Sequence, residues 1–274
     1  MTVLTAFRDG ARVTADHPRL IAAGIATVGC AELASVLGGL GRGGLATLAH
    51  VGWILALPFL LGGLVGSAFV ALEDADVDLA TYLREATGHY RAILTGTILV
   101  VLVLVVAAFA ATTASFVPVA IATVAGLPDG VAAGISWILF LGSTALTVVV
   151  LVAGIAATQF FVAASVVEET GGWRSLTRSV EVVRDNLWSV AGFTVLWGAI
   201  ASAFLAPRYL LPAALVESDI APVPTTGVGQ PLTVLLSTVA IIGIGVGLTY
   251  LYTVYTVYYL DLVSPAREAS SAQD

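Results

Sequence analysis

Six long apolar stretches, separated by short polar segments, form the dominant pattern of this 274-residue chain. A helix needs roughly 20 residues to cross a hydrocarbon core of about 30 Å. The stretches are Leu20–Leu40, Leu45–Leu72, Ala92–Val117, Val131–Ala157, Trp188–Leu210 and Leu232–Tyr255. They are far longer than the roughly ten alternating residues of a membrane barrel strand. The pattern therefore predicts an all-α, polytopic integral membrane protein with six transmembrane helices in a single membrane domain, residues 1–274.

The arginines between these stretches are distributed unequally across the predicted membrane. Only Arg42 and Arg208 fall on one side. The other side carries Arg8, Arg12, Arg19, Arg84, Arg91, Arg174, Arg178, Arg184 and Arg267. Basic residues are retained in the cytoplasm during insertion. We therefore expect a multi-pass protein of the cell membrane with both termini cytoplasmic, whose N-terminal apolar run is kept as the first span rather than cleaved as a signal.

Two of the arginine-bearing inner segments have the spacing of amphipathic helices. In residues 78–93 the apolar positions are Leu79, Leu83, Ala86 and Tyr90, with Arg84, Glu85, His89 and Arg91 largely opposite. In residues 172–188 they are Leu176, Val180, Val183 and Leu187, opposite Arg174, Arg178, Glu181 and Asp185. We predict helices lying on the cytoplasmic membrane surface, with structured loops as the alternative. Such helices could contact lipid phosphate. The candidate residues are Arg84, Arg91, Arg174, Arg178 and Arg184.

A weak internal repeat accompanies these segments. A shift of 72 positions superposes Arg12 on Arg84, His17 on His89, Arg19 on Arg91, Ile21 on Ile93 and Gly24 on Gly96. Residues 173–192 have a similar layout. The unit would be an interfacial helix followed by a hairpin of two spans, used three times; chance identity is the alternative.

Composition narrows the class of protein further. The chain is 58% hydrophobic and 11% charged, whereas a soluble domain carries about a quarter charged residues. The net charge of −7 argues against nucleic acid as a partner. All eleven basic residues are arginine. An acidic protein without lysine is typical of halophilic organisms, although a GC-rich genome would also replace lysine. The single cysteine, Cys30, is expected to be a small buried hydrophobe.

The segment Val166–Leu176, followed by Arg178-Ser179 and Asn186, resembles a recurring inner segment of a known membrane domain. That domain is attached to some glycerophosphoryl diester phosphodiesterases, and six-helix membrane proteins of haloarchaea carry a similar segment. The shared features are an acidic residue after an apolar span, a glycine turn, and a helix with an Arg-Ser pair. The phosphodiesterase catalytic domain has no counterpart in this chain. The resemblance implies a fold and lends no enzyme function.

Glu32 is the most unusual residue of the predicted spans, because a carboxylate at membrane depth is costly unless it is paired. His50 lies at a comparable depth in the next span, and Arg42 and Arg208 lie at the same outer end. These four residues form a candidate intramembrane polar cluster. It would be either a structural lock of the first hairpin or a proton- or cation-handling site, with a protonated or water-accessible glutamate as a third reading.

Other features have ordinary structural explanations. Asp74, Asp76, Asp78 and Glu85 match part of a calcium loop, but Leu79 replaces its glycine, so capping of the next helix is preferred. His17 and His89 are expected to be partly solvated. Gly62-xxx-Gly66 and Gly243-xxx-Gly247 favour close helix packing. Pro58, Pro207 and Pro212 are candidate kinks, Pro118 would end or kink span three, and the tyrosines at 250–259 would lie at the membrane interface.

No phosphate-binding loop, dinucleotide fingerprint, nucleophile elbow or zinc spacing occurs in the sequence, so neither a cofactor nor a metal is predicted. We expect a non-enzymatic membrane protein that acts as a scaffold or accessory component through lipids or a partner. Membrane lipids are the expected partners, with a protein partner or a homo-oligomer left open. The alternative is a small transporter that uses Glu32 in a polar cavity.

Overall fold

The computed structural model describes residues 2–39, 43–73, 75–124, 129–217 and 229–271. The elements in these ranges are all helices, which confirms the predicted class. They are α1 (Val3–Asp16), α2 (Pro18–Gly39), α3 (Gly43–Leu72), α4 (Leu79–Val124), α5 (Asp129–Thr158), α6 (Phe161–Val167), α7 (Gly172–Asp185), α8 (Leu187–Glu217) and α9 (Gly229–Ser271).

Five described stretches are long and apolar enough to cross a membrane. They are Gly43–Leu72, Leu79–Ala110, Trp137–Val167, Leu187–Pro207 and Thr238–Ser264. The remaining predicted span, Leu20–Leu40, falls on α2, a helix of 22 residues. The predicted spans thus all fall on helices, and the apolar run length was a sound guide to them.

Two predicted breaks along α4 are wrong. The inner segment at residues 78–93 and the third predicted span form one continuous helix of 46 residues. This helix also runs past Pro118 to Val124, so the predicted end of the span at Pro118 is wrong, and the alternative of a kink there stays a prediction. Gly88 does not interrupt it, because one glycine within a helix costs only about 1 kcal/mol.

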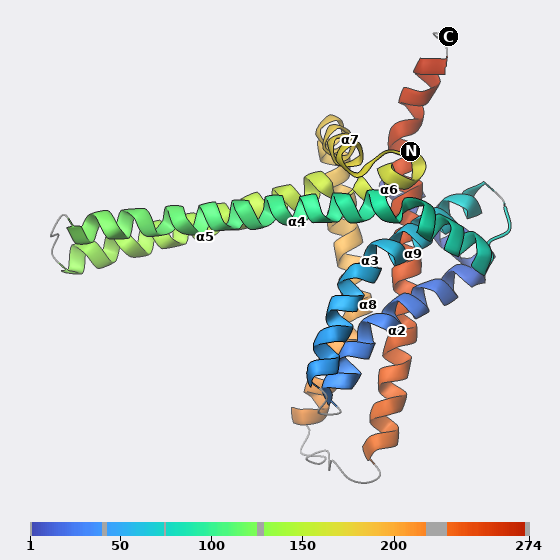
Figure 1. Cartoon of the computed structure of the whole chain (residues 1–274), viewed down its shortest axis with the longest axis horizontal. Coiled ribbons are helices and arrows are strands. Elements are labelled where there is room, and N and C mark those ends of the chain that lie inside the picture. Colours follow the sequence, from blue (N-terminus) through green and yellow to red (C-terminus); the bar gives the residue numbers. More distant parts are fainter. Residues whose placement is uncertain (1, 40–42, 74, 125–128, 218–228, 272–274) are drawn as a thin grey trace.

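The helices form a bundle with a hairpin lying across it. Helices α2, α3, α8 and α9 run alongside one another, whereas α4 and α5 pair into a long hairpin that extends crosswise from one end of them (Figure 1). Helix α9 contacts α1, α2, α3, α6 and α8. The first and last helices of the chain therefore share one core.

That core is aromatic and lies at the end of the bundle from which the hairpin extends (Figure 1). Phe160 is its centre, with ring centroids 5.5 Å from Tyr255 and 5.9 Å from Tyr259. Phe193 stacks on Tyr258 at 4.1 Å with an interplanar angle of 3°. Tyr258 and Tyr259 are 1% and 0% exposed. Tyr255, Tyr258 and Tyr259 therefore pack into the protein core, and the prediction that the tyrosines lie at the depth of the membrane interface stays a prediction.

A break between α5 and α6 brings Phe160 into this core. Ser179 of α7 satisfies the freed backbone groups: its Oγ accepts the N–H of Phe160 at 3.0 Å and donates to the carbonyl of Ala157 at 2.9 Å. The Tyr255 hydroxyl donates to the carbonyl of Gln159 at 2.8 Å and accepts the N–H of Ala163 at 3.2 Å. Buried backbone groups need such partners. The apolar continuation at residues 160–167 is thus a separate buried helix.

Small residues set the closest helix contacts. A Cβ atom at Gly66 would lie 2.5 Å from Cβ of Glu85, and one at Gly62 would lie 3.0 Å from Cδ1 of Ile93. The predicted packing role of the first glycine pair is confirmed. In the second pair, Gly247 packs against Phe204, whereas Gly243 has open space around it.

Candidate functional site

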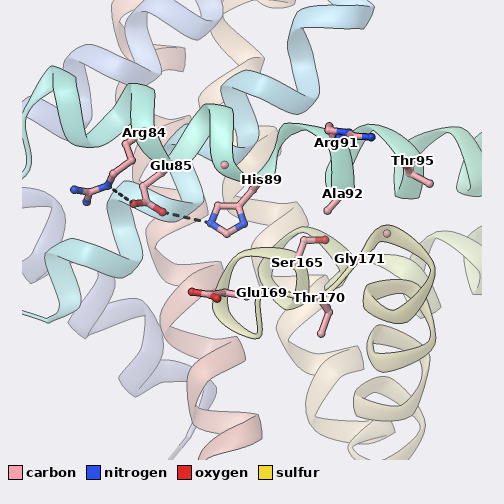
Figure 2. Close-up of a pocket in the computed structure, with 12 residues that line it drawn as sticks. Arg84, Glu85, His89, Arg91, Ala92, Thr95, Ser165, Glu169, Thr170 and Gly171 are labelled. Carbon is pink, nitrogen blue, oxygen red and sulfur yellow. Dashed lines mark hydrogen bonds and ion pairs between the residues drawn. The ribbon is translucent and has the colours of Figure 1, made fainter.

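A polar pocket of about 700 Å³ lies between the first turns of α4 and the turn that joins α6 to α7 (Figure 2). We call it the α4–α7 pocket. Its lining residues are Arg84, Glu85, Gly88, His89, Arg91, Ala92, Thr95, Ser165, Glu169, Thr170, Gly171 and Gly172. Two of the five predicted lipid-phosphate contacts, Arg84 and Arg91, line this pocket.

The α4 wall begins at a capped helix start. The backbone N–H of Thr81 donates to Oδ1 of Asp78 at 2.7 Å, so the predicted capping role of this aspartate is confirmed. This bond holds the pKa of the Asp78 carboxyl below its ordinary value. Asp74 lies outside the described residues. Within the described chain, no group of three or more His, Cys, Asp or Glu side chains could hold a metal ion.

Glu85 carries a small charge cluster on this wall. Its carboxylate lies 3.1 Å from Nε of Arg84 and 3.4 Å from Nε2 of His89. The side chains of Glu85 and His89 are each only 16% exposed. The prediction that Glu85 lies on a water-facing side of the helix is therefore wrong, whereas His89 is partly solvated as predicted. Glycines of α3 leave room for both side chains against the neighbouring helix, and Figure 2 shows the His89 ring pointing from α4 toward the α6–α7 turn.

The opposite wall is the α6–α7 turn, which a network of hydroxyl groups holds. Ser165 donates to Oγ of Ser175 at 2.8 Å, and the hydroxyls of Thr170 and Ser175 also lie 2.8 Å apart. Glu169 adopts φ 49°, the left-handed region that glycine and asparagine favour. This conformation turns the chain sharply between α6 and α7. The network and the turn together place the start of α7 against α4.

The N-terminus of α7 borders the pocket. Its cap residue is Gly171, and no side chain accepts a hydrogen bond from the first turn. A Cβ atom at Gly172 would lie 2.5 Å from the carbonyl oxygen of Ala92 and 2.7 Å from the amide nitrogen of Gly96. Only glycine therefore allows this close approach. Helix N-termini favour anions because their first N–H groups lack partners and the helix dipole is positive there.

The charges of the pocket are of both signs, and they are unequally neutralised. Arg84 and His89 flank the Glu85 carboxylate. Among the described residues, no carboxylate lies within 4.0 Å of the Arg91 guanidinium and no basic group lies within 4.0 Å of the Glu169 carboxylate. Both side chains belong to exposed residues. The pocket thus offers one cationic and one anionic group to a ligand.

A second ionic network lies behind the pocket. Oε1 of Glu168 accepts a hydrogen bond from the Tyr259 hydroxyl at 2.6 Å and another from Nε of Arg178 at 3.0 Å. Glu181 approaches the same guanidinium at 3.5 Å. Arg178, another predicted lipid-phosphate contact, is thus bonded within the protein. Of the two remaining candidates on α7, Arg174 is exposed, and Arg184 is exposed beside Asp185.

The predicted intramembrane cluster falls partly outside the described residues. Glu32 is half-buried on α2. His50 is exposed on α3, where its Nδ1 lies 2.9 Å from the carbonyl oxygen of Ala46. Arg42 and the side chain of Arg208 are not among the described parts of the chain, so this cluster stays a prediction. Cys30 is exposed on α2, and its predicted burial is wrong.

The sequence identified the arginines of the α4–α7 pocket but not its second wall. The signals for that wall were Glu169 immediately before two glycines and the serines at positions 175 and 179. Serines at spacings that fall on one face of α7 indicate hydrogen bonds across a helix contact rather than a water-facing surface. The buried face of this helix is accordingly Gly172, Ser175, Leu176, Ser179, Val182 and Val183.

The all-helical fold and its long apolar helices indicate a multi-pass α-helical membrane protein. The chain belongs to the family described as domain of unknown function DUF7847, whose model matches residues 1–262. This match covers the aromatic residues of the core, of which Tyr259 is the last in the chain. No curated protein and no solved structure matches the chain. The resemblance to the phosphodiesterase membrane domain therefore stays a prediction.

Proposed function

We propose that this protein is a non-enzymatic membrane scaffold that holds a lipid phosphate in the α4–α7 pocket at the cytoplasmic face. The observation that supports this proposal is that Arg84, Arg91 and the uncapped N-terminus of α7 line the same pocket. Guanidinium groups and helix N-termini are the two protein features that bind phosphate best. A bound lipid would tie the start of α4 to α7.

The level of the pocket relative to the membrane supports a lipid as its ligand. Trp173 and Trp188 are exposed at the starts of α7 and α8. Tryptophan prefers the depth of lipid headgroups. Both residues belong to the arginine-rich side of the chain, which the positive-inside rule assigns to the cytoplasm. Headgroup phosphates of the inner leaflet would thus lie at the depth of the pocket.

Our proposal includes six membrane spans, which requires the hairpin of α4 and α5 to stand upright in the bilayer. In Figure 1 the hairpin lies across the bundle, along what would be the inner membrane surface. Surface helices need one polar face. Between Gly96 and Val124 the sequence of α4 contains no charged residue, and consecutive residues such as Val101, Leu102 and Val103 are all exposed. Insertion would surround this surface with hydrocarbon, and it requires α5 to turn at the α5–α6 break and α4 to bend beyond its contacts with α7.

The lipid-phosphate proposal can be tested by native mass spectrometry of the full chain in detergent micelles, titrated with phosphatidylglycerol. We expect the Arg84→Gln/Arg91→Gln variant to bind at least about tenfold more weakly than wild type. Each charge-assisted hydrogen bond to phosphate contributes about 1.5–3 kcal/mol, and 1.4 kcal/mol corresponds to a factor of ten in affinity.

The matched control is Arg8→Gln/Arg12→Gln, which removes two exposed arginines from the inner segment of α1. Its affinity should stay within about twofold of wild type. An equal loss in both variants would mean that lipid binding follows overall charge. A diacylglycerol with the same tails, which lacks phosphate, should bind wild type and pocket variant equally.

A further inference from the structure

The charge pattern of the α4–α7 pocket contains more than a phosphate site requires. Glu169 introduces a carboxylate into the rim of a cavity that two arginines make attractive to anions. A carboxylate near an anionic ligand weakens its binding by charge repulsion. Since Glu85 already neutralises Arg84, a purely anionic ligand would find only Arg91 unopposed.

The two unneutralised groups come from different walls. Arg91 belongs to α4, and Glu169 belongs to the α6–α7 turn (Figure 2). They do not pair with each other, because they are not within 4.0 Å. A ligand that contacts both needs an anionic and a cationic group. The left-handed backbone at Glu169 fixes where the carboxylate leaves the turn.

We infer that the pocket selects a ligand that combines a phosphate with an ammonium group. The phosphate contacts Arg91 and the start of α7, and the ammonium contacts the Glu169 carboxylate. This inference rests on the proposed function, because it names the headgroup class of the lipid held there. The same chemistry occurs in a zwitterionic lipid headgroup and in a water-soluble phosphorylated amine.

The experiment compares short-chain phosphatidylethanolamine, phosphatidylglycerol and phosphatidylcholine by native mass spectrometry of the detergent-solubilised full chain. We expect wild type to bind phosphatidylethanolamine about five- to tenfold more tightly than phosphatidylglycerol. Phosphatidylcholine should bind less tightly than phosphatidylethanolamine, because its quaternary ammonium donates no hydrogen bond to the carboxylate.

The decisive variant is Glu169→Gln, which removes the charge and keeps the size of the side chain. It should abolish the preference for phosphatidylethanolamine and leave phosphatidylglycerol binding equal or stronger. Glu169→Asn, whose side chain tolerates the left-handed conformation, repeats the test if the first variant misfolds. Arg184→Gln serves as a control and should leave the preference intact.

The outcomes separate the two proposals. If Glu169→Gln keeps the wild-type preference while Arg84→Gln/Arg91→Gln weakens both lipids, this inference is overturned and the proposed function stands. If the arginine variant binds both lipids as wild type does, both fail. Phosphoethanolamine without tails distinguishes the sources: tight, Glu169-dependent binding assigns the same charge pairing to a soluble ligand, and weak binding assigns it to the lipid.

Discussion

At the level of single residues, Arg178 shows why an arginine in an amphipathic pattern need not face lipid or water. Its side chain is 30% exposed and its partner Glu168 is 20% exposed. Tyr259 donates to the same carboxylate oxygen, so three elements of the fold meet at one atom. Removing one member of a partly buried ion pair leaves the other charge without compensation.

We therefore predict that Arg178→Gln lowers the free energy of unfolding by roughly 1–3 kcal/mol. The measurement is denaturant-induced unfolding of the purified chain in detergent, followed by tyrosine and tryptophan fluorescence. Arg184→Gln is the matched control on the same helix. Its ion pair with Asp185 is 78% and 63% exposed, and such pairs contribute about 0–1 kcal/mol. Equal losses in the two variants would contradict a structural role for the network.

The environment of a side chain could be predicted from the sequence only where its partners are close to it in the chain. Asp78 was assigned correctly as a cap because capping is local in sequence. Glu85 was assigned to the wrong environment because Gly66 of α3, which accommodates it, lies far away in the chain. The packing of Tyr258 and Tyr259 into a core was not predicted for the same reason: whether an amphipathic ring faces lipid or a core depends on helices that periodicity does not reveal.

At the level of secondary structure elements, the contact between α7 and α4 determines the shape of the pocket. Gly172 brings the two backbones together at Ala92 and Gly96. Apolar run length predicted the long helices well, because lipid requires uninterrupted helical hydrogen bonding. It did not predict the break between α5 and α6. No glycine or proline marks that position, and Ser179 and Tyr255 supply the compensating hydrogen bonds from distant segments.

Gly172→Ala should separate α7 from α4, because the new methyl group would meet backbone atoms that cannot rotate away. Overpacking of this kind costs about 1–3 kcal/mol. We expect a lower unfolding midpoint in denaturant together with weaker lipid binding at the pocket.

Gly192→Ala on α8 provides the comparison, since nothing lies within 4 Å of the added atom. Alanine is the better helix former by about 1 kcal/mol, so this variant should be as stable as wild type or more so. A stable, lipid-binding Gly172→Ala protein would show that the close approach is not required.

At the level of the whole molecule, the orientation of the α4–α5 hairpin relative to the bundle determines how the protein lies in the bilayer. The bundle helices and the hairpin of Figure 1 cannot both be perpendicular to one flat membrane. Exposed apolar residues at consecutive positions, such as Val101, Leu102 and Val103 of α4 and Val148 and Val149 of α5, favour insertion over a surface position. The position of Gly130, at the far end of the hairpin, distinguishes the two arrangements.

We predict that Gly130→Cys, in a Cys30→Ser background, reacts with a membrane-impermeant maleimide from outside intact cells. Arg184→Cys in the same background should react only after permeabilisation, because α7 lies at the inner face. Labelling of both positions only after permeabilisation would place the hairpin along the inner surface. Labelling of Arg184→Cys from outside would reverse the proposed orientation.

The packing of the last helix, α9, against the first two helices has a consequence for biosynthesis. The Tyr250 hydroxyl donates to the carbonyl of Phe7, and Thr249 donates to that of Leu20, across more than two hundred residues. Until the ribosome has synthesised α9, the surfaces of α1 and α2 that pack against α9 have no partner. The translocon or a chaperone must shield the earlier helices until the final one emerges. A nascent polypeptide that stops short of α9 would be a substrate for membrane proteases rather than a smaller working protein.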